Sequence, residues 1–344
     1  MILVLNCGSQ SISWKVFKKD LSLSKEGEIR ISNSDKSDKY EKNLKEIIKE
    51  VKAEFKNIEI VGHRVVHGGT EFKNATVMDK KKIEKLKEFN EWAPLHNPFN
   101  ILGIEIATEN FKNADQVAVF DTEFYSTLSE IAYTYPLPKK IREEHSFKKF
   151  GFHGISHEYA AKEGALMKNL DFNNIKIISC HLGGGCSITA IDKGKAIDTS
   201  MGFTPLEGIV MMTRSGDIDP GIVLKLSKEY GAEKAEEILN KESGMKGLVG
   251  IGDMLDILKE IKKENKKAEK GLKIFVNKIQ KYIGSYYTIL GGCDLICFTG
   301  AIGAGSLKIR NIITKDLPFK EEFKIAPIEP NEELAIAKKI KIIN

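Results

Sequence analysis

Histidine side chains concentrate in a few short polar segments of this 344-residue chain. Six of the seven histidines lie beside glycine or proline or at a glycine-rich turn, whereas histidines with purely structural roles would be expected to scatter. These six are His63, His67, His96, His153, His157 and His181. Because imidazoles exchange protons near neutral pH, the segments that carry them are the first candidates for chemistry.

One carboxylate and one arginine extend this set. Asp121 follows the apolar run 116–120, and α/β proteins commonly bind ligands at the carboxyl ends of their strands. Arg214 lies in the polar loop 213–217, and residues 198–205 add hydroxyl groups. Phosphoryl transfer requires positive charge and N–H donors around a metaphosphate-like group. The residues alone therefore predict a phosphotransferase with a small acceptor.

Each of these residues also has a structural interpretation. An isolated aspartate after a strand more often caps a turn, and an isolated loop arginine more often forms a surface ion pair. A zinc site at His153 and His157 is weakly supported, because the chain lacks an H-E-x-x-H pattern and Gly154 disfavours a helix there. The joint occurrence of these residues is what favours catalysis.

Two glycine turns resemble each other, one in each half of the chain. Residues 5–12 and 180–188 both run from an apolar strand through a polar residue and a glycine turn to serine and a returning strand. Such hairpins present backbone N–H groups and hydroxyls to an anion, so they predict two similar domains facing one phosphate chain. Neither a Walker A loop nor a G-x-G-x-x-G turn is present in a strand-to-helix setting.

Short β-rich runs alternate with longer segments of helical spacing, which predicts an α/β protein. The expected strands are 2–6, 58–66, 116–120, 175–180 and 294–299. The expected helices are 41–55, 79–91, 99–111, 156–167, 220–240 and 268–290.

Composition restricts the class further. A formal net charge of +5 is mild for this length, so we expect no nucleic-acid partner. The N-terminal residues do not resemble a secretory signal, which favours a cytoplasmic protein without a membrane partner. The five cysteines lie in strand-like or glycine-rich segments and predict small buried thiols rather than disulfides or a zinc ribbon.

At these residues the chain resembles the acetate kinases, within the superfamily of acetate and sugar kinases, actin and heat-shock ATPases. The matching runs are 62–69, 93–98, 117–122, 150–157, 198–208, 213–220 and 331–333. The resemblance implies two ribonuclease-H-like α/β domains with an active-site cleft between them, and a homodimer. We expect residues 1–149 with helix 333–344 in the first domain, residues 150–332 in the second, and a hinge near 148–151.

The activity that this resemblance implies is reversible transfer of a phosphoryl group from ATP to acetate, giving acetyl phosphate and ADP with Mg²⁺ or Mn²⁺. Arg64 would hold the carboxylate, and Asp121 would be the central catalytic carboxylate. His153 and Arg214 would stabilise the transferring group. The residues expected to support the site are His96 and His181, those expected to hold the metal are Asn6 and Glu332, and those expected to line the acyl pocket are Val66, Leu95, Phe152 and Pro205.

The nucleotide side departs from the family pattern. Its expected contacts are Ser9, Ser11, His181, Leu182, Gly183, Gly184, Gly185, Asp253, Met254, Leu255, Ala301, Ile302, Gly303, Ala304 and Gly305. Ser13 replaces a family lysine, Gly184 replaces an asparagine, and an arginine is missing near Leu255. Residues 301–305 lack the family's glutamate and asparagine. These losses predict weakened or altered nucleotide selectivity, with another nucleoside triphosphate or pyrophosphate as the alternative donor.

Two further alternatives stay open. Propionate kinases share most of these motifs, and a pocket discriminates by only about 1–3 kcal/mol per methylene, so propionate should also react less well. A degenerate ligand-binding member is disfavoured because the catalytic motifs are intact. Family members are longer, and the shortening here is expected before residue 58, near 252 and between 310 and 325.

Overall fold

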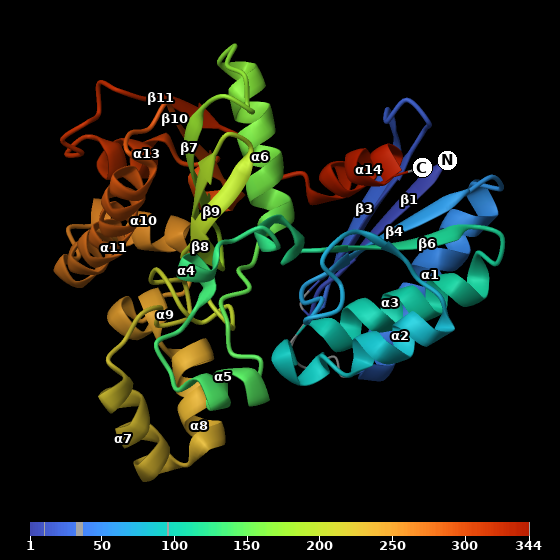
Figure 1. Cartoon of the computed structure of the whole chain (residues 1–344), viewed down its shortest axis with the longest axis horizontal. Coiled ribbons are helices and arrows are strands. Elements are labelled where there is room, and N and C mark those ends of the chain that lie inside the picture. The colour runs from blue at the N-terminus through green and yellow to red at the C-terminus, as the bar shows by residue number, and fades with distance from the viewer. Residues whose placement is uncertain (10, 32–36, 95, 344) are drawn as a thin grey trace. The chain divides into compact units, whose positions relative to one another are not determined.

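The computed structural model describes residues 1–9, 11–31, 37–94 and 96–343 (Figure 1). Contacts divide the chain into two compact units. Unit 1 comprises Met1–Ser126 and Asn331–Asn344, and unit 2 comprises Thr127–Pro330. Each unit has its own mixed β-sheet, so the predicted α/β class with two domains is confirmed.

Unit 1 contains a six-stranded sheet in the order β3-β2-β1-β4-β6-β5. Its strands are β1 (Ile2–Cys7), β2 (Ser11–Phe17), β3 (Leu23–Arg30), β4 (Ile60–Val65), β5 (Thr76–Val77) and β6 (Asp115–Phe120). Strands β1, β4 and β6 are mutually parallel, whereas β1, β2 and β3 form an antiparallel meander. The carboxyl ends of β1, β4 and β6 therefore meet at one edge of the sheet.

Helices cover both faces of this sheet (Figure 1). They are α1 (Ser37–Glu54), α2 (Lys80–Lys87), η1 (Asn90–Trp92), α3 (Asn97–Asn110), η2 (Glu123–Tyr125) and α14 (Glu332–Ile343). The side chains of Leu3 and Leu5 pack into a core with α1 and α3, and α14 packs on the opposite face. Gly62 allows that close approach, because a Cβ there would lie 2.4 Å from Ile340 Cδ1.

Unit 2 repeats the same plan with five strands in the order β11-β10-β7-β8-β9. They are β7 (Lys176–Leu182), β8 (Cys186–Asp192), β9 (Lys195–Thr199), β10 (Leu295–Thr299) and β11 (Lys324–Pro327). Strands β7, β8 and β9 form the meander, and β10 and β11 run parallel to β7. The β1–β2 and β7–β8 hairpins thus hold equivalent places, which confirms the repeated hairpin predicted from residues 5–12 and 180–188.

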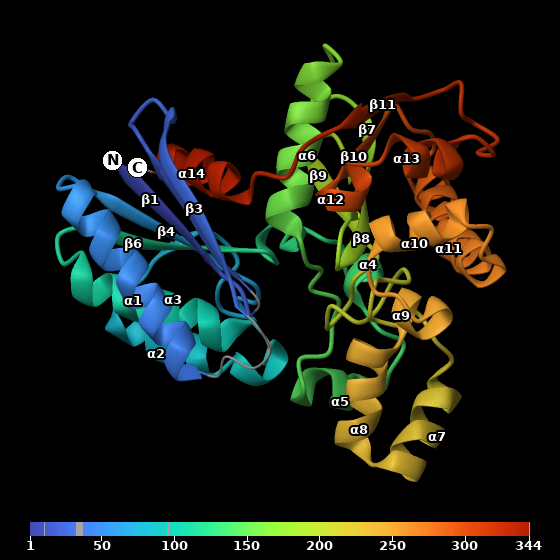
Figure 2. The same ribbon diagram turned by 180° about the vertical axis from the view of Figure 1, so that it is seen from behind.

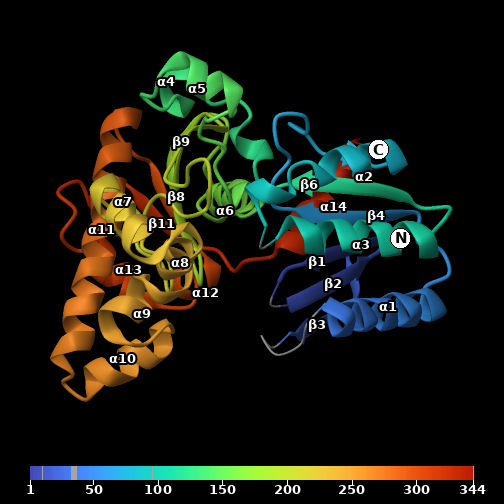
Figure 3. The same cartoon turned by 90° about the horizontal axis from the view of Figure 1, so that it is seen from below.

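The helices of unit 2 place α6 on one face of the sheet and α11 on the other (Figures 2 and 3). They are α4 (Glu130–Tyr133), α5 (Lys139–Glu144), α6 (Gly154–Met167), α7 (Pro220–Tyr230), α8 (Ala232–Glu237), the π-helical turn η3 (Ile238–Glu242), α9 (Gly244–Val249), α10 (Met254–Lys262), α11 (Lys266–Leu290), α12 (Gly300–Gly303) and α13 (Leu307–Thr314).

Two sequence expectations about helices are wrong. The single helix expected over 220–240 is interrupted at Gly231, whose φ of 85° ends α7 before α8 begins. Gly154 does not prevent a helix, because it is the first residue of α6 and directly follows His153, the N-cap residue. The predicted buried thiols are confirmed: Cys7, Cys180, Cys186, Cys293 and Cys297 are all free and buried.

Residues 127–149 group with unit 2 rather than unit 1. The backbone N–H of Lys149 donates to the Tyr133 carbonyl, and the Tyr135 hydroxyl accepts from the Phe203 N–H at 2.8 Å. The contact boundary thus precedes the expected one at 149/150, and a hinge near 148–151 stays a prediction. Among the residues described, no helix combines the length and apolarity needed to cross a membrane.

Candidate active site

Three polar side chains gather at the edge of unit 1 where the parallel strands end. Asn6 lies near the end of β1, Arg64 lies near the end of β4, and Asp121 follows β6 directly. The register pairs Leu5 with His63 and Arg64 with Val119, which brings the three ends level. Strand order thus assembles residues that are far apart in the sequence.

Arg64 is the centre of this cluster. Its Nη2 donates to Asp121 Oδ2 at 2.8 Å, and its Nη1 donates to Glu332 Oε2 at 2.7 Å. Burial alone would lower the pKa of Arg64, but the charges of Asp121 and Glu332 outweigh it and the pKa is raised. Burial raises the pKa of Asp121, and the Arg64 charge opposes that rise. The guanidinium therefore holds a buried carboxylate at the strand ends.

Glu332 reaches the cluster from the first turn of α14. Asn331 caps this helix by accepting from the Leu334 N–H at 3.2 Å, and acidic side chains in a first turn are stabilised by the helix dipole. The Asn6 Nδ2 donates to Glu332 Oε2 at 3.1 Å. The metal residues expected from the sequence, Asn6 and Glu332, are therefore neighbours in unit 1.

These oxygen donors fit magnesium, which binds proteins through one or two carboxylates and keeps several waters. The described residues include no group of three or more His, Cys, Asp or Glu side chains that could hold a metal ion. A magnesium ion beside Asn6 and Glu332 would therefore take most of its ligands from water and phosphate.

Ser13 contacts the same helix turn. Its hydroxyl donates to Glu333 Oε1 at 2.6 Å, and Lys15, two residues along β2, donates to Asn331 Oδ1 at 3.0 Å and lies 3.8 Å from Glu333 Oε2. Because residues two apart share a face of a strand, Lys15 and Ser13 both face the start of α14. Ser13, at the position where the family is expected to carry lysine, therefore contacts α14 through its hydroxyl.

Asparagines at the start of α3 fix the neighbouring loops. Asn97 accepts from the His67 N–H at 3.1 Å and donates to the His67 carbonyl at 3.0 Å. Asn100 accepts from the Val66 N–H at 3.0 Å and donates to the Cys7 carbonyl at 2.7 Å. Both asparagines are buried, so the two loops that follow β1 and β4 are tied to one helix.

The expected acyl-pocket and supporting residues are divided between the units. Val66 is buried behind β4, and His96 lies half-buried just before α3 in unit 1. Leu95 lies outside the described residues. Phe152 is buried in unit 2, and the carbonyl of Pro205 accepts from Arg214 Nη1 at 3.4 Å.

Unit 2 brings three histidines together at the start of α6 and the end of β7. His153 adopts a left-handed backbone conformation with a φ of 58°, and its carbonyl accepts from the His157 N–H. The rings of His153 and His181 stack with centroids 4.2 Å apart. Ser187 Oγ lies between two of the ring nitrogens, 2.9 Å from His153 Nδ1 and 2.7 Å from His157 Nε2.

Arg214 lies beside this group at the second glycine turn. A Cβ built on Gly185 would be 3.3 Å from His153 Nε2 and 3.6 Å from Arg214 Nη1, so glycine leaves the space beside both groups open. Burial lowers the pKa of Arg214. No carboxylate of the described residues pairs with it, and its recorded contacts are the Pro205 carbonyl and Met211 Sδ at 3.9 Å. A cation in such surroundings is suited to binding an anion.

The expected nucleotide segments of unit 2 lie next to one another. Strands β7 and β10 pair with His181 opposite Thr299, and α12 packs against the ends of both strands (Figure 2). A Cβ on Gly183 would lie 3.9 Å from the Ala301 nitrogen. The turn 182–185 and the segment 301–305 therefore form one surface.

The remaining expected nucleotide segment is 253–255. The loop that carries Arg214 lies between this segment and the glycine turn 182–185. The Met212 N–H donates to the Gly184 carbonyl at 3.3 Å, and a Cβ on Gly252 would lie 3.7 Å from Thr213 Cγ2. Asp253 caps α10 by accepting from the Asp256 N–H at 3.0 Å.

The side chains at the start of α10 differ in exposure. Met254 is buried, whereas Leu255 is 66% exposed. Ser9 and Ser11 belong to the β1–β2 hairpin of unit 1.

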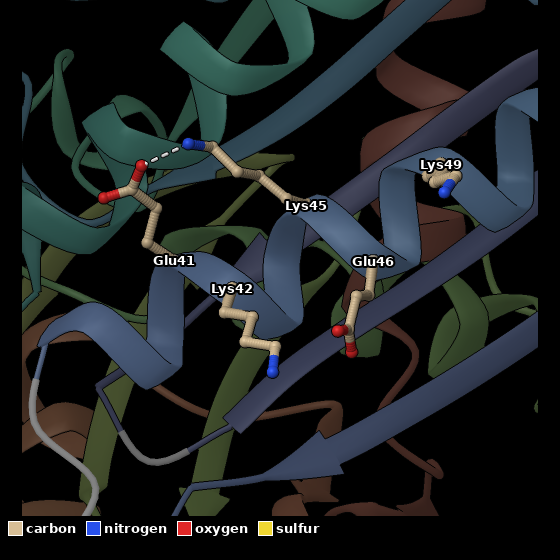
Figure 4. Close-up of a pocket in the computed structure, with 5 residues that line it drawn as sticks. All are labelled: Glu41, Lys42, Lys45, Glu46 and Lys49. Carbon is tan, nitrogen blue, oxygen red and sulfur yellow. Dashed lines mark ion pairs between the residues drawn. The ribbon is translucent and has the colours of Figure 1, made fainter.

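A surface hollow on α1 lies away from these groups. It is lined by Glu41, Lys42, Lys45, Glu46 and Lys49 (Figure 4). Glu41 and Lys45 form an ion pair of 2.6 Å one helical turn apart. Alternating charges on an exposed helix face are typical of a solvated surface, so we assign this hollow no role.

The sequence reasoning missed the residues that position the site. Asn97, Asn100, Ser179 and Ser187 are buried and bond to site loops or histidines. Asn97 and Ser187 lie inside or beside segments that the sequence had singled out, but serine and asparagine are common residues. Only the pairing of distant elements reveals their partners.

Two mixed sheets, in which the order β3-β2-β1-β4-β6 of unit 1 corresponds to β9-β8-β7-β10-β11 of unit 2, define a two-domain α/β protein with the fold of sugar kinases. A putative N-acetylmannosamine kinase from Listeria monocytogenes shares this fold at 14% identity, with a TM-score of 0.54 and coverage of 100% of this chain and 99% of the other.

Closer relatives identify the family. A sequence profile of the acetokinase family matches residues 18–325. Acetate kinase of Clostridium novyi is 39% identical over 99% of this chain and 98% of its own. The crystal structure of acetate kinase from Entamoeba histolytica is 34% identical, with a TM-score of 0.88 over 99% of this chain and 98% of its own. The chain belongs to the acetokinase family, and its enzymatic activity is the acetate kinase activity of that family.

Proposed function

We propose that this enzyme transfers a phosphoryl group reversibly from ATP to acetate, giving acetyl phosphate and ADP. The observation that carries the proposal is Arg214, a half-buried cation beside His153 and Gly185 with no carboxylate partner among the described residues. Such a guanidinium can stabilise the charge that spreads over the equatorial oxygens of a transferring phosphoryl group. His153 would donate from Nε2 to the same oxygens.

In unit 1, Arg64 would bind the acetate carboxylate. Its contacts with Asp121 and Glu332 use Nε, Nη1 and one hydrogen of Nη2, which leaves a donor on Nη2 for a substrate. Asp121 would orient the guanidinium and stand as the central carboxylate of the reaction.

Magnesium, held by Asn6 and Glu332, would neutralise charge on the donor phosphates when bound. Mn²⁺ prefers similar oxygen ligands and should replace it. The nucleotide would contact the surface formed by residues 182–185 and 301–305, together with the start of α10. His181 would support His153 through their stacked rings.

Donor identity is tested by a hydroxamate assay of acetyl phosphate formation with ATP, GTP, ITP and pyrophosphate in parallel. The substitutions at Ser13, Gly184 and residues 301–305 lead us to expect weak discrimination among the nucleotides. Strong preference for ATP at ordinary affinity would refute altered selectivity. Turnover with pyrophosphate and with no nucleotide would identify pyrophosphate as the donor in place of ATP. Absence of turnover with every donor would favour a ligand-binding protein without catalysis.

A second acceptor is favoured by one comparison. A propionate kinase from Francisella tularensis matches with a TM-score of 0.86 at 32% identity, covering 98% of each chain. An acyl pocket sized for acetate should disfavour one extra methylene by roughly 10- to 200-fold in kcat/KM. Equal or greater kcat/KM for propionate would assign that substrate instead.

We further propose a cytoplasmic homodimer that contacts its partner largely through unit 2. Helix α7 buries none of its side chains within the chain, yet Ile222, Leu224 and Tyr230 are 47%, 63% and 54% exposed. Exposed apolar side chains grouped on one helix are typical of an interface. Light scattering coupled to gel filtration should give the mass of a dimer, and the mass of a monomer would contradict this.

A further inference from the structure

The histidines of unit 2 are linked by a continuous line of hydrogen bonds that reaches into the core. Ser179 Oγ lies 2.8 Å from His157 Nδ1, His157 Nε2 lies 2.7 Å from Ser187 Oγ, and Ser187 Oγ lies 2.9 Å from His153 Nδ1. Ser179, Ser187 and His157 are fully buried. His153, at the other end, is half-buried at the glycine turn.

The outer nitrogen of His153 faces the place where a phosphoryl group would bind. Its Nε2 is the atom 3.3 Å from a Cβ built on Gly185, and Arg214 Nη1 lies near the same point. A hydrogen on Nε2 would donate to a phosphoryl oxygen there, whereas a bare Nε2 would present a lone pair to an anion. The tautomer of His153 therefore matters for any reaction at this turn.

A neutral imidazole has one donor and one acceptor nitrogen, and the single hydroxyl hydrogen of buried Ser187 is satisfied only by donating to one of the two rings that it contacts, so the line can run in two directions. In the outward direction, the Ser179 hydroxyl donates to His157 Nδ1, and His157 Nε2–H donates to Ser187. The Ser187 hydroxyl then donates to His153 Nδ1, which leaves the proton of His153 on Nε2. Every hydrogen between Ser179 and His153 Nδ1 then has an acceptor, and the Nε2 hydrogen of the half-buried His153 faces the glycine turn.

The inward direction leaves one hydrogen without a partner. His157 Nδ1–H would donate to Ser179, and the Ser179 hydroxyl hydrogen would need another acceptor. Within the described part of the chain, Ser179 Oγ contacts His157 alone. A buried hydroxyl hydrogen without an acceptor destabilises the fold, which favours the outward direction. Burial lowers the pKa of His157 far below its ordinary value, so this ring stays neutral and transmits the direction.

We propose that Ser179, His157 and Ser187 are positioning residues that hold His153 as the Nε2–H tautomer, so that its donor faces the phosphoryl site beside Gly185 and Arg214. The catalytic meaning of this arrangement rests on the proposed function. The arrangement itself does not, because the tautomer can be observed without turnover.

The direct test is ¹⁵N NMR of the full chain labelled with [¹⁵N]histidine, at about pH 8.5 where an ordinary imidazole is neutral. Protonated and bare ring nitrogens resonate in separate ranges, and His153→Gln and His157→Gln assign the signals. We expect protonated Nε2 and bare Nδ1 in both rings. Protonated Nδ1 as the main form of His153 would overturn the proposal, whatever the enzyme's activity.

Kinetics of Ser187→Ala and Ser179→Ala test the consequence. Loss of the directing hydroxyl should lower kcat by about 10- to 100-fold for Ser187→Ala, and less for Ser179→Ala, with KM for acetate unchanged. Ser179→Thr keeps the hydroxyl and should restore kcat. Ser179 contacts His157 and not His153, so a lower kcat in Ser179→Ala would mean that the effect passes through His157. A role of Ser179 in packing does not predict this.

Thr314→Val is the matched control, because Thr314 carries a buried hydroxyl of unit 2 that donates to the Arg310 carbonyl at 2.9 Å and lies in α13, outside the segments assigned to the site. It should lose stability without changing kcat or the tautomer of His153. Wild-type kcat in folded Ser187→Ala, or an equal fall in kcat for Thr314→Val, would refute the positioning role.

Discussion

The two arginines of the site use their charge in different ways. Arg64 is bound by Asp121 and Glu332, so its guanidinium is fixed before any substrate arrives. Arg214 contacts a carbonyl and a thioether, and no carboxylate among the described residues pairs with it. We expect the first arrangement to position a donor for a carboxylate and the second to stabilise charge that develops during transfer.

His63 gives a prediction about stability at this scale. Burial lowers its pKa to about 4, although its bond to Gln116 opposes the shift. Because the folded pKa is below the unfolded value near 6.5, the stabilisation is present above about pH 6.5 and is lost as pH falls toward 4. Between pH 7 and 4 the wild type should lose about 3 kcal/mol of unfolding free energy through His63, and His63→Gln should not lose this amount.

Urea denaturation of wild type and His63→Gln at several pH values measures the effect. The difference between their unfolding free energies should shrink by about 1.4 kcal/mol per pH unit below pH 6.5. Above pH 7 the two curves should run parallel, which serves as the internal control. A difference that stays constant from pH 7 to 4 would contradict the account.

Sequence reasoning found the charged residues of each cluster and missed the residues that orient them. Arginine, aspartate and histidine are rarely buried without a reason, so Arg64, Asp121 and His153 stood out beside glycine and strand ends. The partners of His153 depend on pairing between β7 and β8, which sets Ser179 and Ser187 against α6. That pairing is a property of the fold rather than of a local motif.

At the scale of elements, repeated local patterns were the most predictable. Both glycine hairpins lie where the sequence places them, because apolar strands and glycine turns are local signals. The break at Gly231 was not predicted, because the apolar spacing continues across it. A single glycine can therefore end a helix at a position that the periodicity of apolar residues does not reveal.

Gly216 tests whether backbone packing holds the Arg214 loop. Its φ is 66°, and a Cβ there would lie 2.5 Å from the Gly208 carbonyl oxygen. Gly250 has a φ of 89° but nothing within 4 Å of its Cβ position, so it is a matched control. Gly216→Ala should cost about 3 kcal/mol or more in unfolding free energy and lower kcat, whereas Gly250→Ala should cost about 1–2 kcal/mol. If Gly216→Ala and Gly250→Ala lost the same unfolding free energy and kcat were unchanged, the Arg214 loop would tolerate the displacement of its backbone.

Gly184 tests the nucleotide surface. A Cβ at Gly184 would meet no atom within 4 Å, so Gly184→Asn adds the family's amide without a clash. If the missing amide weakens nucleotide binding, the variant should lower KM for ATP several-fold, as expected for one hydrogen bond of about 1 kcal/mol. Gly284→Asn, on α11 with equally open space, is the control and should leave KM unchanged. An unchanged KM in Gly184→Asn would locate the altered selectivity elsewhere.

At the scale of the whole molecule, the chain is a shortened member of its family. Its alignment with the Clostridium novyi enzyme runs over 392 residues, against 344 residues in this chain, and covers 98% of that relative. Both charged clusters are nonetheless present and intact. The shortening therefore leaves in place the residues that we propose for phosphoryl transfer.

The central claim is that Asp121 in unit 1 and Arg214 in unit 2 serve one reaction, and kcat of the single and double variants tests it most directly. With ATP and acetate in the hydroxamate assay, Asp121→Asn and Arg214→Ala should each lower kcat by about 10²- to 10⁴-fold while the proteins stay folded. Residues that act on one transition state are not additive, so the double variant should be little worse than the poorer single variant. Near-wild-type kcat in either single variant, or losses that multiply in the double variant, would contradict the account.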